Sequence, residues 1–72
     1  MTQENLLITL GMRIRKIRLS KDITQSQLAI ICDFDKSTMS KIEAGQVNVS
    51  YYTLHRLSEG LDVHICKLLS TD

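Results

Sequence analysis

The most constraining feature of this sequence is the stretch from Thr24 to Gly45, where two short helices are predicted with only three residues between them. Thr24 and Gln27 have the spacing of a capping box, in which two side chains satisfy free backbone N–H groups at the start of a helix. Asp33 is expected to break this helix, and Asp35 to cap a second one that Gly45 ends. Two short helices so close together predict a helix-turn-helix.

The apolar residues of this stretch recur at intervals that suit two helices packed against each other. Counted from Gln25, they occupy the fourth, eighth, tenth, fifteenth and eighteenth positions: Leu28, Cys32, Phe34, Met39 and Ile42. The fifth position is Ala29, and a residue this small lets the helices cross closely because a larger side chain would push them apart. The pattern is therefore specific for helix-turn-helix packing.

Helices are also predicted on both sides of this stretch, and together they indicate an all-α fold of five helices. The first helix should end near Lys21, with Asp22 in the left-handed backbone that closes it. Its apolar stripe consists of Leu6, Leu7, Leu10, Ile14 and Ile17. Ser50 caps a fourth helix that carries Leu54, Leu57 and Leu61. A short fifth helix over about 64–69 should turn Ile65, Leu68 and Leu69 inward.

Length and composition fit one domain of this kind. A chain of 72 residues has room for a single domain over 1–72, with the helix-turn-helix at 24–45. Only 4% of the residues are aromatic whereas 43% are hydrophobic, so aliphatic side chains must fill the core. The lack of proline and the presence of only three glycines argue against a β-rich fold with many turns.

The net charge is only +1, but the charges are unevenly distributed. Residues 1–41 hold seven basic and four acidic side chains, whereas residues 42–72 hold two and four. Five of the cations fall between Arg13 and Lys21. A one-sided positive field suits a polyanion better than a membrane, and its weakness suggests that a monomer alone binds poorly. An ordinary solvated helix face is the alternative interpretation of this cluster.

Several other classes of protein are not indicated. The apolar run at 6–10 is too short for a membrane span and lacks the flanks of a signal peptide, so a cytoplasmic protein is expected. Cys32 and Cys66 are expected to be free thiols, and with His55 and His64 they show none of the spacings of a zinc site. The sequence has no Gly-rich phosphate loop or nucleophile elbow, so it predicts no cofactor, no small-molecule ligand and no enzymatic activity.

Four segments carry a resemblance to a known family: Ile14-Arg15-Lys16-Ile17-Arg18, Thr24-Gln25-Ser26-Gln27-Leu28-Ala29, Ser37-Thr38-Met39-Ser40-Lys41-Ile42-Glu43-Ala44-Gly45, and Leu54 to Leu61. From about Leu10 to Leu69 the chain resembles the lambda-repressor-like, Cro-type helix-turn-helix regulators of bacteria and phages. Asn48-Val49-Ser50 before a leucine-rich helix is also similar to restriction–modification controller proteins. Asp33 and Asp22 stand where the family usually or often has Gly, and Val49 replaces its usual Pro. The resemblance places the acidic Asp33 close to the DNA.

The second helix of the motif separates an apolar face from a polar one. Met39 and Ile42 point one way, and the opposite face is formed by Lys36, Ser37, Ser40 and Lys41. Such a helix fits the major groove of DNA, where Lys donates to guanine O6 and N7 and Ser contacts either kind of base edge. These four residues are therefore predicted to read bases, the alternative being a solvated face.

Phosphate contacts are expected beside this helix. Gln25 stands in the first turn of its helix, where free N–H groups and the helix dipole favour an anion, and the resemblance implies that it binds the DNA backbone. Thr38, Asn48 and Tyr51 are further predicted phosphate ligands, and either Tyr51 or Tyr52 is expected in the core. The resemblance also implies that Arg18 and Glu43 form a buried or half-buried ion pair that fixes the third helix against the first.

The C-terminal segment has more apolar residues than one short helix can bury. Val63, Ile65 and Leu69 are therefore predicted to form a homodimer interface, the alternative being that they only close the monomer core. A two-fold dimer would bind a palindromic operator in double-stranded DNA. Together these features predict a sequence-specific DNA-binding transcriptional regulator, either a dimeric repressor or a controller. The alternative is an antitoxin-like or other protein-interaction module with the same fold.

Overall fold

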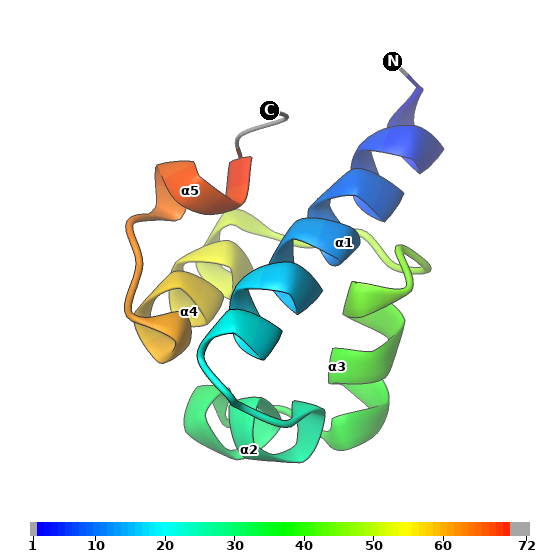
Figure 1. Ribbon diagram of the computed structural model, residues 1–72. Coiled ribbons are helices and arrows are strands. Elements are labelled where there is room, and N and C mark those ends of the chain that lie inside the picture. Colours follow the sequence, from blue (N-terminus) through cyan, green and yellow to red (C-terminus); the bar gives the residue numbers. More distant parts are fainter. Residues whose placement is uncertain (1, 70–72) are drawn as a thin grey trace.

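The computed structural model describes residues 2–69, and within them the chain forms five helices. They are α1 (Gln3–Ser20), α2 (Gln25–Cys32), α3 (Lys36–Glu43), α4 (Tyr51–Leu61) and α5 (Ile65–Leu69). In Figure 1, α1 crosses the molecule between α3 on one side and α4 and α5 on the other, and α2 closes the lower end. In the described residues, α2 contacts α3 and α4, α1 contacts α3 and α5, and α4 contacts α5. The predicted all-α fold is confirmed.

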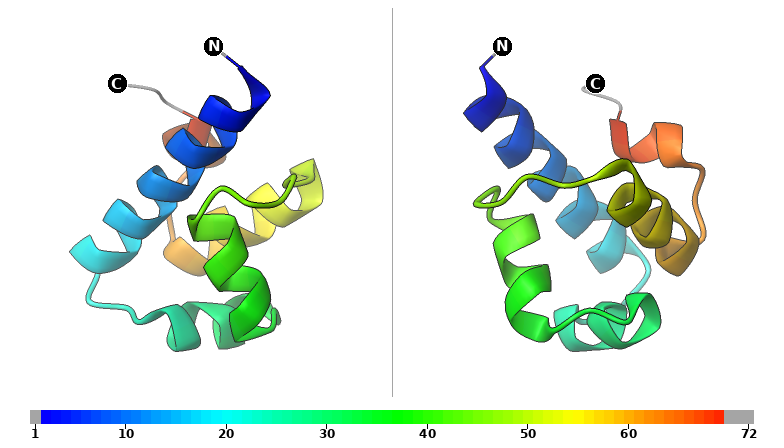
Figure 2. Two further views of the ribbon diagram at one scale, coloured as in Figure 1. Left: turned by 90° about the vertical axis from the view of Figure 1, so that its right-hand side faces the viewer. Right: turned by 180° about the vertical axis from the view of Figure 1, so that it is seen from behind.

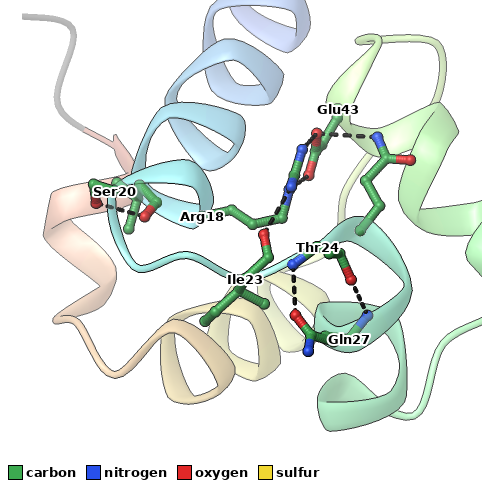
Figure 3. A network of polar contacts seen from close by, with 8 residues as sticks. Arg18, Ser20, Ile23, Thr24, Gln27 and Glu43 are labelled. Carbon is green, nitrogen blue, oxygen red and sulfur yellow. Dashed lines mark hydrogen bonds and ion pairs between the residues drawn. The ribbon is translucent and has the colours of Figure 1, made fainter.

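Three of the helices, α1, α2 and α4, begin after a polar side chain that caps them. The hydroxyl oxygens of Thr2, Thr24 and Ser50 each accept a hydrogen bond from a backbone N–H three residues further on, at 3.0–3.1 Å. The side chain of Gln27 accepts from the N–H of Thr24 at 2.8 Å, which completes the predicted capping box (Figure 3). Asp35 occupies the N-cap position of α3, but its side chain makes no capping hydrogen bond, so that part of the prediction was wrong.

Aspartates close three of the helices. Asp22, Asp33 and Asp62 have φ values of 57°, 60° and 57°, in the left-handed region where glycine is least strained. Asp tolerates this region better than most residues because its short polar side chain can bond locally. The prediction that Asp22 closes the first helix and that Asp33 breaks the second is confirmed.

The core is aliphatic, as predicted. The residues with the largest fully buried side chains are Ile14, Leu28, Met39, Leu57, Leu61, Leu68 and Cys32. Every apolar position of the predicted helix-turn-helix pattern contributes, since Ala29 and Ile42 are also buried and Phe34 packs against the cluster. Burial raises the pKa of the Cys32 thiol, an effect that the nearby Arg56 charge opposes. Cys32 therefore serves as a small apolar core residue.

Leu6, Leu69 and one of the two tyrosines at the start of α4 are more exposed than the sequence predicts. Leu6 is 49% exposed because the first turns of α1 extend beyond the neighbouring helices (Figure 1). Leu69, in the last turn of the short α5, is 55% exposed instead of turned inward. Tyr51 and Tyr52 are 70% and 66% exposed, so the expectation that one of them lies in the core was wrong.

Close backbone contacts fix α1 against α3 and against the loop between α3 and α4. A Cβ atom on Gly11 would lie 2.3 Å from the carbonyl oxygen of Glu43, so no larger residue fits where the two helices meet. A Cβ atom on Gly45, whose φ is 73°, would lie 2.7 Å from the Cα atom of Ile8. The position of α3 is therefore set by direct contact with α1. None of the helices within residues 2–69 is long and apolar enough to cross a membrane.

Candidate nucleic-acid interface

One whole face of α3 is polar and open to solvent. Met39 and Ile42 are buried in the core, whereas the side chains predicted to read bases (Lys36, Ser37, Ser40 and Lys41) are all exposed. The left view of Figure 2 shows α3 standing at the front of the molecule, with no other helix covering it. A helix anchored by two apolar residues thus presents a row of hydrogen-bond donors outward.

The charge on this face is positive. Lys36 and Lys41 are the cations of α3, and its single acid, Glu43, is buried and paired. The nearest exposed acids in the sequence are Asp33 and Asp35 in the turn before α3. The outer face of α3 therefore carries two ammonium groups without a carboxylate among them, which favours an anionic ligand.

The predicted partners Arg18 of α1 and Glu43 of α3 form a buried ion pair. The guanidinium donates from Nε to Oε2 at 2.7 Å and from Nη2 to Oε1 at 3.1 Å, and the two side chains are only 8% and 3% exposed (Figure 3). A third donor, Nη1, binds the carbonyl oxygen of Ile23 at 2.8 Å. Arg18 therefore joins α1, the end of the α1–α2 loop and α3 at one point.

Gln25, a predicted phosphate ligand, belongs to the same network. Its Nε2 donates to Oε1 of Glu43 at 3.1 Å. A carboxamide has two N–H donors, so the second remains for another acceptor. This contact could not be predicted from the sequence, because nothing in the pattern relates residues that are 18 positions apart.

Asn48 and Thr38 lie on the opposite flank of α3. Both line a surface hollow between α3 and the α3–α4 loop, together with Lys41 and Thr53. The Oδ1 atom of Asn48 accepts a hydrogen bond from Nε2 of Gln3, in the first turn of α1, at 2.7 Å. Gln3 was not among the predicted functional residues.

The two tyrosines at the start of α4 have different partners. The ring of Tyr51 lies 6.4 Å from that of His55, measured between centroids. The hydroxyl oxygen of Tyr52 accepts from Nη1 of Arg56 at 2.9 Å, and Nη2 of the same guanidinium donates to the carbonyl oxygen of Cys32 at 2.7 Å. Arg56, which sequence reasoning also missed, thus binds a carbonyl group at the C-terminal end of α2 and links that end to α4.

The residues predicted to form a dimer interface lie in and just before α5. Val63 and Ile65 are half-buried, with Val63 packed against the core, whereas Leu69 is mostly exposed. The segment therefore contributes to the monomer core and still leaves a leucine on the surface.

Comparison with known proteins links this architecture to regulators. The helix-turn-helix family pattern matches residues 14–68. Control protein C.BamHI of Bacillus amyloliquefaciens is 38% identical over 66 residues, which cover 90% of this chain and 82% of that protein. Control protein C.MunI of Mycoplasma sp is 36% identical over 64 residues, or 88% and 86% of the two chains. The crystal structure of the restriction–modification controller C.AhdI from Aeromonas hydrophila superimposes with a TM-score of 0.84 at 34% identity, covering 86% of this chain and 94% of that one.

Proposed function

Since the chain belongs to the helix-turn-helix family of DNA-binding transcription regulators, we propose that it acts as a homodimeric controller that reads a palindromic operator with α3. The observation that carries this proposal is the exposed, acid-free face of α3, flanked on both sides by amide donors. The similarity to control proteins of restriction–modification systems suggests genes of such a system as the target. We also propose that residues 1–72 work as a single domain in the cytoplasm.

In the proposed complex, Lys36, Ser37, Ser40 and Lys41 contact base edges in the major groove. Gln25, Thr38, Asn48 and Tyr51 donate to phosphates on the two sides of α3. Base contacts supply the sequence preference, and phosphate contacts fix the position of the protein on the duplex. The ion pair of Arg18 and Glu43 holds α3 at the angle that both sets of contacts need.

The direct test is selection of duplexes from a random pool, followed by gel-shift measurement on the selected sequence at several salt concentrations. Selection should return a two-fold symmetric consensus. Affinity should fall markedly from low to physiological salt, because each neutralised phosphate releases counterions. Failure to bind any selected duplex would refute DNA reading and favour the protein-interaction module.

The dimer is proposed because a single short helix reads few base pairs and the net charge of +1 adds little attraction. Val63, Ile65 and Leu69 form the proposed interface. Leu69→Glu should abolish association in sedimentation at micromolar concentration, because it places a charge in an apolar contact. Ile30→Glu is the matched control, since Ile30 is 78% exposed on α2 rather than near α5. A wild-type chain that remains monomeric both free and on a palindromic duplex would contradict the dimer.

A further inference from the structure

The contact between Gln3 and Asn48 joins two exposed side chains that are 45 residues apart. Its two ends are both fixed by other interactions. The first turn of α1 is capped by Thr2, and the start of the loop is held where Gly45 meets the backbone of Ile8. The hydrogen bond therefore bridges two fixed backbone segments at the edge of the proposed DNA surface.

The contact engages one end of the Asn48 amide and leaves the other end open. A carboxamide has an oxygen that accepts and a nitrogen with two N–H donors. Because Nε2 of Gln3 donates to Oδ1, the oxygen of Asn48 is engaged and its Nδ2 donors remain available. A phosphate oxygen can only accept, so in this orientation the Asn48 amide presents the N–H groups that a phosphate needs.

The surroundings of Asn48 also fit this ligand. The hollow that Asn48 lines is shared with Thr38, Lys41 and Thr53, which add two hydroxyl groups and an ammonium group, and its remaining lining is apolar: Phe34, Ile42 and Val47. No acid is among its lining residues within the described part of the chain. A backbone phosphate next to α3 would meet donors from the loop, α3 and α4.

We propose that Gln3 is a positioning residue for DNA binding, which orients the Asn48 amide so that its N–H groups face a backbone phosphate. The inference rests on the proposed function, because it assigns a role at the same DNA surface. Gln3 does not need to touch DNA for this role. Substitution of Gln3 should therefore change the affinity for DNA only when Asn48 is present.

A double-mutant cycle tests this dependence. Gln3→Ala, Asn48→Ala and the double variant are compared with the wild type by fluorescence anisotropy on a selected duplex and by thermal melting. Gln3→Ala should weaken binding about threefold, and Asn48→Ala by at least as much, as expected for loss of one hydrogen bond. In the Asn48→Ala background, Gln3→Ala should have no further effect, and all three variants should melt like the wild type.

Gln3→Glu tests the orientation itself. A carboxylate accepts but does not donate, so it would bind the Nδ2 group of Asn48 and turn Oδ1 toward the phosphate. Binding should therefore weaken more than in Gln3→Ala. Asn5→Asp is the control, because it adds the same charge in the same turn of α1, and the hydrogen bond that Asn5 makes to Thr2 uses its backbone N–H and not its side chain. It should bind more tightly than Gln3→Glu.

Several results would overturn the proposal while the proposed function stands. One is that Gln3→Ala leaves the affinity for DNA unchanged while Asn48→Ala weakens it. Another is that Gln3→Ala weakens binding equally in the wild-type and Asn48→Ala backgrounds. A third is that Gln3→Ala lowers the melting temperature. Equal losses from Gln3→Glu and Asn5→Asp would overturn it as well. Failure of the wild type to bind any selected duplex is a different result, which refutes the proposed function itself.

Discussion

The two flanks of α3 hold an amide in different ways. On one flank, Gln25 donates to Glu43, which is buried and paired with Arg18. On the other flank, Asn48 accepts from Gln3, and both of these side chains are exposed and uncharged. The first amide is thus fixed by a buried ion, and the second by a neutral neighbour at the surface.

The difference lies in what happens when a partner is lost. A buried ion that loses its counter-ion still carries its desolvation cost, which is no longer offset by the ion pair, so the free energy of unfolding falls. An exposed amide that loses its partner is hydrated instead, and the fold hardly changes. In the proposed complex, the buried flank therefore couples DNA binding to stability, whereas the exposed flank lets the affinity for DNA change without a change in stability.

The largest effect is expected from breaking the buried flank. Arg18→Ala should lower the free energy of unfolding by about 3–5 kcal/mol and weaken DNA binding, because it leaves the Glu43 carboxylate buried without its counter-ion. Urea unfolding and gel shift measure the two effects. The double variant Arg18→Met with Glu43→Leu should recover most of the stability but not the affinity, since Gln25 has lost its acceptor. Unchanged melting in Arg18→Ala would show that the ion pair is not important for the fold.

A second comparison separates base reading from phosphate binding. Lys41→Ala should change the preferred bases and cost about 1–3 kcal/mol on the best sequence. Gln25→Ala should cost about 1 kcal/mol on every sequence alike. Competition between selected and scrambled duplexes measures both. Equal, sequence-independent losses would mean that Lys41 does not face the bases.

A smaller effect is expected at the turn between α2 and α3. Asp33→Gly should raise the free energy of unfolding by about 0.5–1 kcal/mol, because it relieves the left-handed backbone at some cost in chain entropy. It should also tighten DNA binding about twofold by removing a negative charge near the phosphates. Asp62→Gly is the control, with the same backbone geometry and charge change at the end of α4. An equal gain in affinity from both variants would place Asp33 no closer to DNA than Asp62.

The smallest effect on stability is expected from the exposed flank. Gln3→Ala should shift the melting temperature by no more than about 3 °C, because surface substitutions without charge or burial cost little. Calorimetry on the same samples as Arg18→Ala compares the two flanks directly. Similar destabilisation by the two variants would remove the distinction between them.

The features that could be predicted from sequence are those set by near neighbours. The capping box of Thr24 and Gln27 and the left-handed Asp22 and Asp33 depend on a few adjacent residues, and the apolar positions of α2 and α3 follow helical spacing. The resemblance to Cro-type regulators added the pairing of Arg18 with Glu43.

The contacts that escaped prediction join residues far apart in the chain. Gln25 meets Glu43, Gln3 meets Asn48, and Arg56 meets the carbonyl group of Cys32, across 18, 45 and 24 positions. These are single polar contacts that follow no periodic pattern in the sequence, and they depend on the relative positions of whole helices in the folded protein. Burial at the ends of helices was also misjudged, as with Leu6 and Leu69, because the spacing does not show where a neighbouring helix stops.

The direct contact between Gly11 and the carbonyl group of Glu43 has a consequence for the spacing of operator sequences. At this point no side chain separates α1 from α3, and the ion pair of Arg18 and Glu43 joins the same two helices, so α3 is held firmly within its subunit. In the proposed dimer, the separation of the two α3 helices is then set by the subunit contact alone. One extra base pair between the half-sites moves the second half-site about 3.4 Å away from the first and rotates it by about 35° around the DNA axis. Only bending of the DNA can compensate, so the distance between half-sites is expected to be as selective as the bases within them.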